Sequence, residues 1–367
     1  MTENEILAVM RLQNVPNIGD VTAKKLISHC GSPEAVFTDK AHQLQKIDGI
    51  GTFTIRGLHD AEHREAAEAE YKYITDNAIS HCYFTDADYP DYLKHCIDSP
   101  VLLFKRGNID LEKRKIISVV GTRKITSYGT ALCEELIETL APLEPIIVSG
   151  FAYGVDICAQ RAAINYGLQT IGCLAHGLNQ IYPKVHAKYT DDVEKNGGFL
   201  TEFWSTSNPD RENFLKRNRI IAGMAEATVV VESAEKGGSL VTADIANSYN
   251  RDVFAFPGRA KDKYSTGCNN LIKQQKAHML TSAADLLYIL GWNAEAPEIK
   301  GVQKQLFVAL EVTEQAIYDY LQKNGKQQLD VIALKCQLPV FKVSSTLLNM
   351  EMKGVIRPLP GKLFEAI

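Results

Sequence analysis

Short apolar runs alternate with amphipathic helical patterns between residues 80 and 290, and this alternation constrains the fold more than any other feature of the chain. Strands that are apolar on both faces and separated by helices are typical of a parallel sheet covered on both sides. We therefore predict an α/β domain over 80–290, with any ligand bound beyond the carboxyl ends of the strands. The predicted strands are Ile116–Val120, Ile146–Ser149, Thr170–Leu174, Phe199–Phe203, Thr228–Val231, Val253–Phe256 and His278–Leu280.

The segments on either side of this block have other patterns. Residues 1–75 are helical, with glycine-centred turns at 15–19 and 47–51, and we predict a small helical domain of the helix-hairpin-helix or SAM-like kind. Few basic residues flank these turns, which favours packing or protein interaction over contact with a nucleic-acid backbone. A polar stretch, 291–304, is predicted to be a linker. The helices and hairpin expected over 305–367 are typical of a winged-helix domain.

The composition sets broad limits on the class of protein. The chain of 367 residues has a formal net charge of −4 and no long apolar run, so no membrane span is expected. Its first residues lack the pattern of a signal peptide, and its eight cysteines form no C-x-x-C pair. We therefore expect a cytoplasmic protein with reduced thiols. The acidic total does not exclude a local basic groove.

Several loops that follow predicted strands share one chemistry. Glycines and small residues at a strand-to-helix turn leave backbone N–H groups that favour anions, and an arginine beside them suits phosphate. A single turn of this kind, taken alone, is better explained as a tight turn or a helix cap. Because they recur at one edge of the sheet, we predict a shared phosphate-binding pocket. Its residues are Gly121, Thr122 and Arg123 from the first loop, Ser149 and Gly150 from the second, and Gly238 and Ser239 from a later one.

The segment 211–219 holds four cations, one acid and a central phenylalanine. A stacking aromatic beside phosphate-binding cations is how single strands are held without sequence being read. The alternative is that the ring belongs to the core and the cations form a solvated helix face, and the sequence alone favours neither. The predicted binding residues of this segment are Arg211, Phe214, Lys216, Arg217 and Asn218.

Other chemistries have little support in the sequence. There is no G-x-x-x-x-G-K-[ST] loop, Gly121 begins no G-x-G-x-x-G, and the histidines lack metal-ligand spacing. We therefore expect neither a metal nor a cofactor. Glu202 and Glu232 each end a predicted strand, where either is a candidate general acid or base or a structural partner of loop amides.

Ten ordered motifs resemble the DNA-processing protein A (DprA, also called Smf) family over nearly the full length. The resemblance implies an extended Rossmann-like central domain that binds single-stranded DNA, dimerises through that domain, helps load the RecA recombinase in natural transformation, and is not an enzyme. The motifs are Tyr89–Asn108, Val119–Arg123, Ser149–Asp156, Gly177–Pro183, Thr201-Glu202, Phe214–Gly223, Val229–Glu232, Gly238–Ala243, Val253–Gly258 and Gly267–Ile272.

The resemblance also implies roles for single residues. Arg123 and Arg211 would contact phosphate and Phe214 would stack on a base. Arg217 and Asn218 would shape the same pocket, and Gly238-Ser239 would add donors. The chain departs from the family at Arg211, where lysine is usual, and at Leu215, where proline is usual.

Two other interpretations stay open. The same scaffold and its Gly-Gly-Ser helix entry resemble nucleotide-processing enzymes of the lysine-decarboxylase-like group. That resemblance implies hydrolysis of a nucleoside monophosphate, with Glu202 or Glu232 as acid or base. The basic segment favours DNA, because one mononucleotide does not need so many cations. A third hypothesis is a scaffold whose terminal domains bind partners.

Overall fold

The computed structural model describes residues 1–112, 115–292, 310–359 and 363–366. The chain forms two compact units, Met1–Ala294 and Glu295–Ile367, and each is described by itself.

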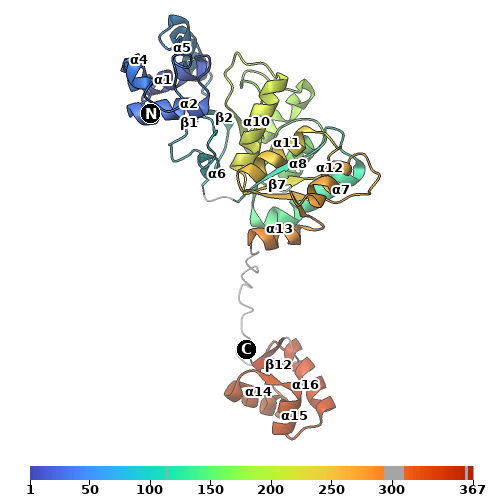
Figure 1. Ribbon diagram of the computed structural model, residues 1–367. Coiled ribbons are helices and arrows are strands. Elements are labelled where there is room, and N and C mark those ends of the chain that lie inside the picture. The colour runs from blue at the N-terminus through green and yellow to red at the C-terminus, as the bar shows by residue number, and fades with distance from the viewer. Residues whose placement is uncertain (113–114, 293–309, 360–362, 367) are drawn as a thin grey trace. The chain divides into compact units, whose positions relative to one another are not determined.

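A nine-stranded sheet forms the centre of the first unit, in the order β1-β2-β6-β5-β4-β3-β7-β8-β9 (Figure 1). Strands β3 to β9 pair in parallel, and β2 runs antiparallel to both of its neighbours. The strands are β1 (Ser80–Tyr83), β2 (Leu102–Gly107), β3 (Ile116–Val120), β4 (Ile146–Ser149), β5 (Thr170–Cys173), β6 (Gly197–Thr201), β7 (Ala227–Val230), β8 (Asp252–Ala255) and β9 (His278–Met279).

The predicted α/β fold with a Rossmann-like sheet is confirmed. Every predicted strand forms, to within two residues at either end. Strands β1 and β2 were not predicted, and they make the sheet mixed rather than purely parallel. Antiparallel strands can be joined without a crossover helix. The alternation of apolar runs and helices, on which the prediction rested, therefore does not reveal such a pair.

Helices cover both faces of the sheet (Figure 1). In β3, Ile116 and Val120 pack in the cluster under one helical layer, and Ile117 and Val119 pack in the cluster under the other. This two-sided burial is why the strands are apolar throughout. The first layer contains α10 (Arg211–Met224), α11 (Gly238–Ser248) and α12 (Thr266–Lys273), and the second contains α7 (Ser127–Leu140), α8 (Val155–Asn165) and α13 (Ala283–Leu290).

The order of the strands places a crevice at the carboxyl edge of the sheet. The chain runs outward from β3 through β4, β5 and β6 and then returns to β7, on the other side of β3. The direction of the strand order therefore reverses at β3, which is called a topological switch point. The loops after β3 and β7 leave in opposite directions there, and open α/β sheets bind ligands in the crevice between such loops.

The N-terminal helices pack on the β1–β2–β6 side of the sheet. Leu26 of α2 and Val36 of α3 belong to one hydrophobic cluster with Phe104 and Phe199 of the sheet. The turn at 15–19 joins α1 to α2 as predicted, whereas the turn at 47–51 leads into further turns. The helices are α1 (Glu3–Asn14), α2 (Asp20–Cys30), α3 (Ala35–Thr38), α4 (Ala41–Leu44) and α5 (Ala61–Asp76).

The second unit is a winged-helix domain, as predicted. It has its own hydrophobic core, which includes Ile317, Leu321 and Leu347. The predicted linker falls largely on 293–304, outside the described residues, and the predicted domain limits stay predictions. The elements are α14 (Val312–Asn324), β10 (Gln327–Gln328), α15 (Leu329–Lys335), α16 (Val340–Met352), β11 (Ile356–Leu359) and β12 (Leu363–Ala366), with sheet order β10-β12-β11.

None of the described helices is, on its own, both long and apolar enough to cross a membrane. Only α15 and α16 taken together satisfy length and composition, and they are bent by 110° relative to one another.

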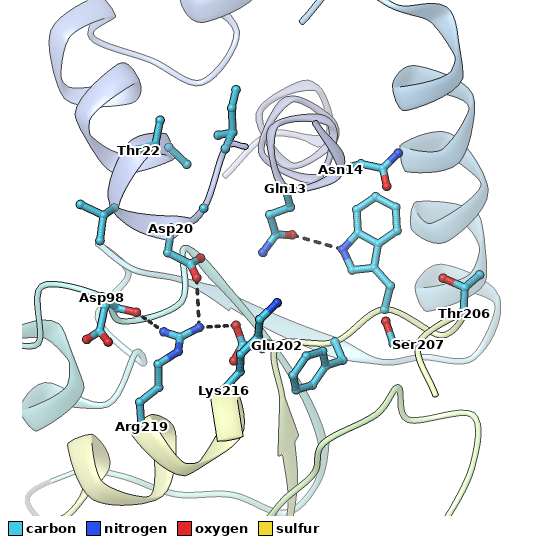
Figure 2. A pocket seen from close by; sticks show the side chains of 16 residues that line it. Gln13, Asn14, Asp20, Thr22, Asp98, Glu202, Thr206, Ser207, Lys216 and Arg219 are labelled. Carbon is cyan, nitrogen blue, oxygen red and sulfur yellow. Dashed lines mark hydrogen bonds and ion pairs between the residues drawn. The ribbon is translucent and has the colours of Figure 1, made fainter. Parts of the chain in front are cut away.

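A buried ion-pair network joins α2 to α10 across a cavity of about 500 Å³ (Figure 2). Arg219 of α10 pairs with Asp20 of α2 at 3.0 Å, pairs with Glu202 beyond β6, and donates to the carbonyl of Asp98. Asp20 also accepts the N–H of Val101 at 2.8 Å. The N-terminal helices are therefore held to the same helix that borders the crevice.

Glu202 is a member of this network whose charge is poorly compensated. Burial raises the pKa of Glu202 to about 7, although the charge of Arg219 works in the opposite direction. Its Oε1 is buried and has no hydrogen-bond partner in the described part of the chain. A carboxyl group in this setting is held more easily in its protonated form.

We expect the free energy of unfolding to fall as the pH rises from about 4.5, the ordinary pKa of Glu202, to about 7. The folded state holds this proton more tightly than the unfolded state does, so its advantage is lost as the proton leaves. Glu202→Gln should flatten the pH dependence by on the order of 3 kcal/mol at most. Denaturant titrations across this interval measure it, with exposed Glu235→Gln as the matched control. Identical curves for wild type and Glu202→Gln would contradict the expectation.

Candidate functional site

A cavity of about 510 Å³ occupies the crevice, between the loops after β3 and β7 and the first turns of α10 and α11. We call it the α10 pocket. Nine of the twelve residues predicted to bind line it, although they come from separate parts of the sequence. They are Gly121, Thr122, Arg123, Arg211, Phe214, Arg217, Asn218, Gly238 and Ser239.

Arg217 anchors α10 to the sheet beneath the pocket. Its guanidinium is almost fully buried, at 4% exposure, and Nη1 donates to the carbonyls of Gly150 and Cys173. These carbonyls lie at the ends of β4 and β5. The side chain of Asp156 faces Arg217, and burial raises the pKa of Asp156 while the arginine lowers it. Arg217 is therefore engaged within the protein and shapes the pocket from below.

The ring of Phe214 lines the α10 pocket and belongs to none of the hydrophobic clusters of the described chain. Its centroid lies 5.3 Å from the guanidinium carbon of Arg123 and 5.7 Å from that of Arg217. The ring of Tyr182 meets it edge-on at 5.8 Å. Of the two interpretations of this phenylalanine, the structure supports the pocket residue. Leu215, at the position where proline is usual in the family that the sequence resembles, lies inside α10, and the helix continues through it without a break.

The charges around the pocket are mostly positive. Arg123, Arg211 and Lys236 are exposed, and none of them makes an ion pair with a carboxylate in the described ranges. Asp156 is the acidic residue among the lining residues, and Arg217 faces it. The pocket therefore carries a local excess of positive charge in a chain whose formal net charge is −4. Such a surface favours a polyanion.

The turn after β3 is closed by protein contacts. The N–H of Thr122 donates to the carbonyl of Glu232 at 2.7 Å, and the Thr122 carbonyl accepts the N–H of Val155 at 3.1 Å. Gly154 has a φ of +79°, and a Cβ there would lie 2.1 Å from the Thr122 carbonyl oxygen, so no larger residue fits. The Thr122 amide is thus used internally, and Arg123 extends from a fixed turn.

The beginning of α11 forms the opposite side of the pocket. Helix α11 begins at Gly238, and the residue at its N-cap position, Gly237, has no side chain that could cap the first amides. The hydroxyl of Ser239 lies 3.0 Å from that of Ser233 and donates to it. An uncapped helix beginning of this kind presents backbone donors and a partial positive charge to an anion.

Three predicted residues do not line the pocket. Ser149 is buried and donates its hydroxyl to the carbonyl of Val119 at 2.7 Å. Gly150 lies against Arg217, and a Cβ there would be 2.4 Å from Nη1 of that residue. Lys216 points to the other face of α10, into the cavity that contains Arg219 (Figure 2). Contact of these three residues with a ligand stays a prediction.

The sequence analysis missed two residues of this site. Lys236 lines the pocket. It could have been predicted from the sequence, because it directly precedes the Gly237-Gly238 pair. Tyr182 reaches Phe214 from the segment after β5, and no local pattern connects the two residues.

The two candidate catalytic glutamates lie outside the α10 pocket. Glu202 lines the other cavity and pairs with Arg219. The carboxylate of Glu232 accepts both the N–H and the hydroxyl of Thr126, at 2.9 and 2.6 Å. Glu232 is thus a structural partner of the turn. Neither carboxylate is among the described residues that line the α10 pocket.

Comparison with known proteins identifies the family. Residues 80–291 match the model of DNA recombination-mediator protein A, and residues 308–362 match the DprA winged helix domain. The DNA processing protein DprA of Streptococcus pneumoniae is 34% identical over 78% of this chain and 93% of its own length. Protein Smf of Escherichia coli is 36% identical over 74% of each chain.

Solved structures agree with these matches. The crystal structure of S. pneumoniae DprA superposes with a TM-score of 0.63 and 30% identity, over 78% of this chain and 98% of that one. A structure of DNA processing protein A from Helicobacter pylori, which concerns the single-stranded DNA binding mode of that protein, gives a TM-score of 0.53 and 27% identity. It covers 58% of this chain and 96% of that one. The chain therefore belongs to the DprA/Smf family of DNA recombination mediators.

Proposed function

We propose that this chain binds single-stranded DNA in the α10 pocket without reading its sequence. Its role would be to protect incoming DNA and to help load RecA during natural transformation and recombination. The observation that carries the proposal is the group of three exposed cations, Arg123, Arg211 and Lys236, around the half-buried ring of Phe214. Phosphates neutralise such cations, and any base can stack on such a ring because every base has a π-face.

Each part of the pocket takes a separate role in this proposal. Arg123 and Arg211 bind phosphates on either side of a base that stacks on Phe214. Lys236 and the first amides of α11 hold a neighbouring phosphate. Arg217 and Asn218 keep the pocket in shape, because both are buried. The single-stranded DNA binding of the H. pylori relative supports a single strand as the ligand.

We expect Arg123→Glu combined with Arg211→Glu to weaken binding to oligo-dT by on the order of 100-fold or more. Two phosphate contacts become repulsive, and neither residue is buried. Fluorescence anisotropy of a labelled oligonucleotide measures the affinity. Arg123→Ala alone should lower the salt-dependence slope by about 0.7.

Lys40→Glu with Lys273→Glu is the matched control, because it makes the same charge change at exposed lysines outside the pocket. Circular dichroism should show that both double variants are folded. If the Arg123/Arg211 variant binds oligo-dT as tightly as the lysine control, the pocket assignment is wrong.

RecA loading is the second part of the proposal, and membership of a recombination-mediator family supports it. On DNA coated with a single-strand-binding protein, we expect the chain to shorten the lag of RecA-dependent ATP hydrolysis. The Arg123/Arg211 variant should not shorten it, because it cannot hold the strand. A lag that the wild-type chain leaves unchanged, under conditions in which it binds the DNA, would contradict this role.

Dimerisation through the Rossmann-like domain completes the proposal. Strand β9 is the last strand of the sheet, and Met279 on it is 53% exposed. Helix α13 follows directly, with Tyr288 exposed at 88% and Ile289 also on the surface. Edge strands and adjoining exposed apolar side chains are common sites of association, which makes this end of the sheet the favoured contact.

A further inference from the structure

Aromatic side chains continue beyond Phe214 on the side of the α10 pocket toward β4 and β5. Tyr182, whose ring meets Phe214 at 5.8 Å, is 41% exposed and thus has a free face. Tyr153 is 46% exposed in the loop between β4 and α8. It lies between Ala152, which lines the pocket, and Gly154, which packs against the backbone of Arg123. Both tyrosines therefore border the proposed DNA pocket.

A buried histidine holds the next part of this surface in place. The ring of His186 packs edge-on against Tyr153 at 5.0 Å and lies 6.1 Å from the ring of Tyr189. Nδ1 of His186 donates to the carbonyl of Phe151 at 2.9 Å, which fixes the orientation of the imidazole. His186 therefore holds Tyr153 and Tyr189 in place. Because these side chains are already ordered, less conformational entropy is lost when a ligand stacks on them.

Cations accompany these rings. The Nζ of Lys188 lies 5.0 Å from the centroid of Tyr189, and the guanidinium carbon of Arg161 lies 5.5 Å from it. Lys184 is exposed in the same segment. None of the three makes an ion pair with a carboxylate in the part of the chain that the structure describes. Exposed Asp191 and Asp192 follow Tyr189 and mark the end of the positive surface.

We propose that a single strand leaving the α10 pocket continues across Tyr182, Tyr153 and Tyr189, with its phosphates held by Lys184, Lys188 and Arg161. We call this surface the tyrosine track. The inference rests on the proposed function, because the pocket must first hold the strand. One exposed tyrosine on a surface needs no explanation. Here two tyrosines border the phosphate pocket, His186 supports Tyr153 and Tyr189, and unpaired cations lie beside Tyr189. Together these residues have the composition of a single-strand path.

The test compares two lengths of oligo-dT, of about 4 and about 12 nucleotides, which lie within the range of site sizes known for single-strand-binding domains. The variant Tyr153→Ala with Lys188→Glu removes one ring and one cation of the tyrosine track. We expect it to weaken binding of the longer oligonucleotide about tenfold or more and to leave the shorter one within about twofold. Phe214→Ala, in the pocket, should weaken both.

Tyr166→Ala with Lys273→Glu is the matched control, since Tyr166, at the end of α8, is 41% exposed and Tyr153 is 46% exposed. Tyr153→Phe with Lys188→Arg should restore binding, because the ring and the charge are kept. Lys188→Glu with Arg161→Glu, which leaves the tyrosines intact, should give the same length-dependent loss if the first variant does not fold.

The outcomes separate the two proposals. If the wild-type chain binds neither oligonucleotide, the proposed function is wrong. If it binds both and the track variants bind the longer one as tightly as wild type, the tyrosine track is wrong. Equal weakening of both lengths would also overturn it, because these residues would then belong to the pocket itself.

Discussion

The buried guanidinium of Arg217 is the interaction on which the site depends. It joins α10 to the carbonyl ends of β4 and β5 and faces the buried carboxyl of Asp156. Because α10 is thereby fixed in rotation as well as in position, Phe214, one turn earlier, is fixed over the crevice. Removing one partner from a buried pair of this kind typically costs about 3–5 kcal/mol. The pocket is therefore preorganised by an arginine whose Nη1 is already bound to two backbone carbonyls.

Helix α10 serves two sides of the first unit. One face presents Arg211 and Phe214 to the α10 pocket, and the other presents Lys216 and Arg219 to the cavity beside α2. Arg219 binds acids and a carbonyl from three distant segments (Figure 2). The N-terminal helices and the proposed DNA site thus share one rigid element. A strand held at Phe214 and a change at α2 can therefore influence one another through this helix.

Much of this arrangement could be predicted from the sequence, because it follows from periodicity. Strands buried on both faces are apolar throughout, and glycine turns at their ends converge on one edge, which brings five of the predicted residues into the pocket. The other four predicted residues that line it come from α10. It was harder to predict which residues of α10 face the pocket. Lys216 is only two residues from Phe214, yet it lines the cavity on the opposite side of the helix. A helix turns by about 100° per residue, so neighbours in sequence face different surfaces.

The remaining features depend on contacts that no local pattern records. Ser149 resembles a loop donor, but its hydroxyl is used by the neighbouring strand. The network of Arg219 draws on Asp20, Asp98 and Glu202, which are far apart in the chain. Tyr182 meets Phe214 only because the loop after β5 folds over the start of α10. Such long-range pairs become visible only in three dimensions.

Photo-cross-linking of oligo-dT that carries 5-bromouracil tests the central claim most directly, since it reports which residue lies against a base. The cross-linked peptide is identified by mass spectrometry on the full chain. The account predicts that the main cross-link falls on Phe214, and that it disappears in the Arg123→Glu, Arg211→Glu variant. Cross-links confined to the winged-helix domain or to the N-terminal helices would contradict it.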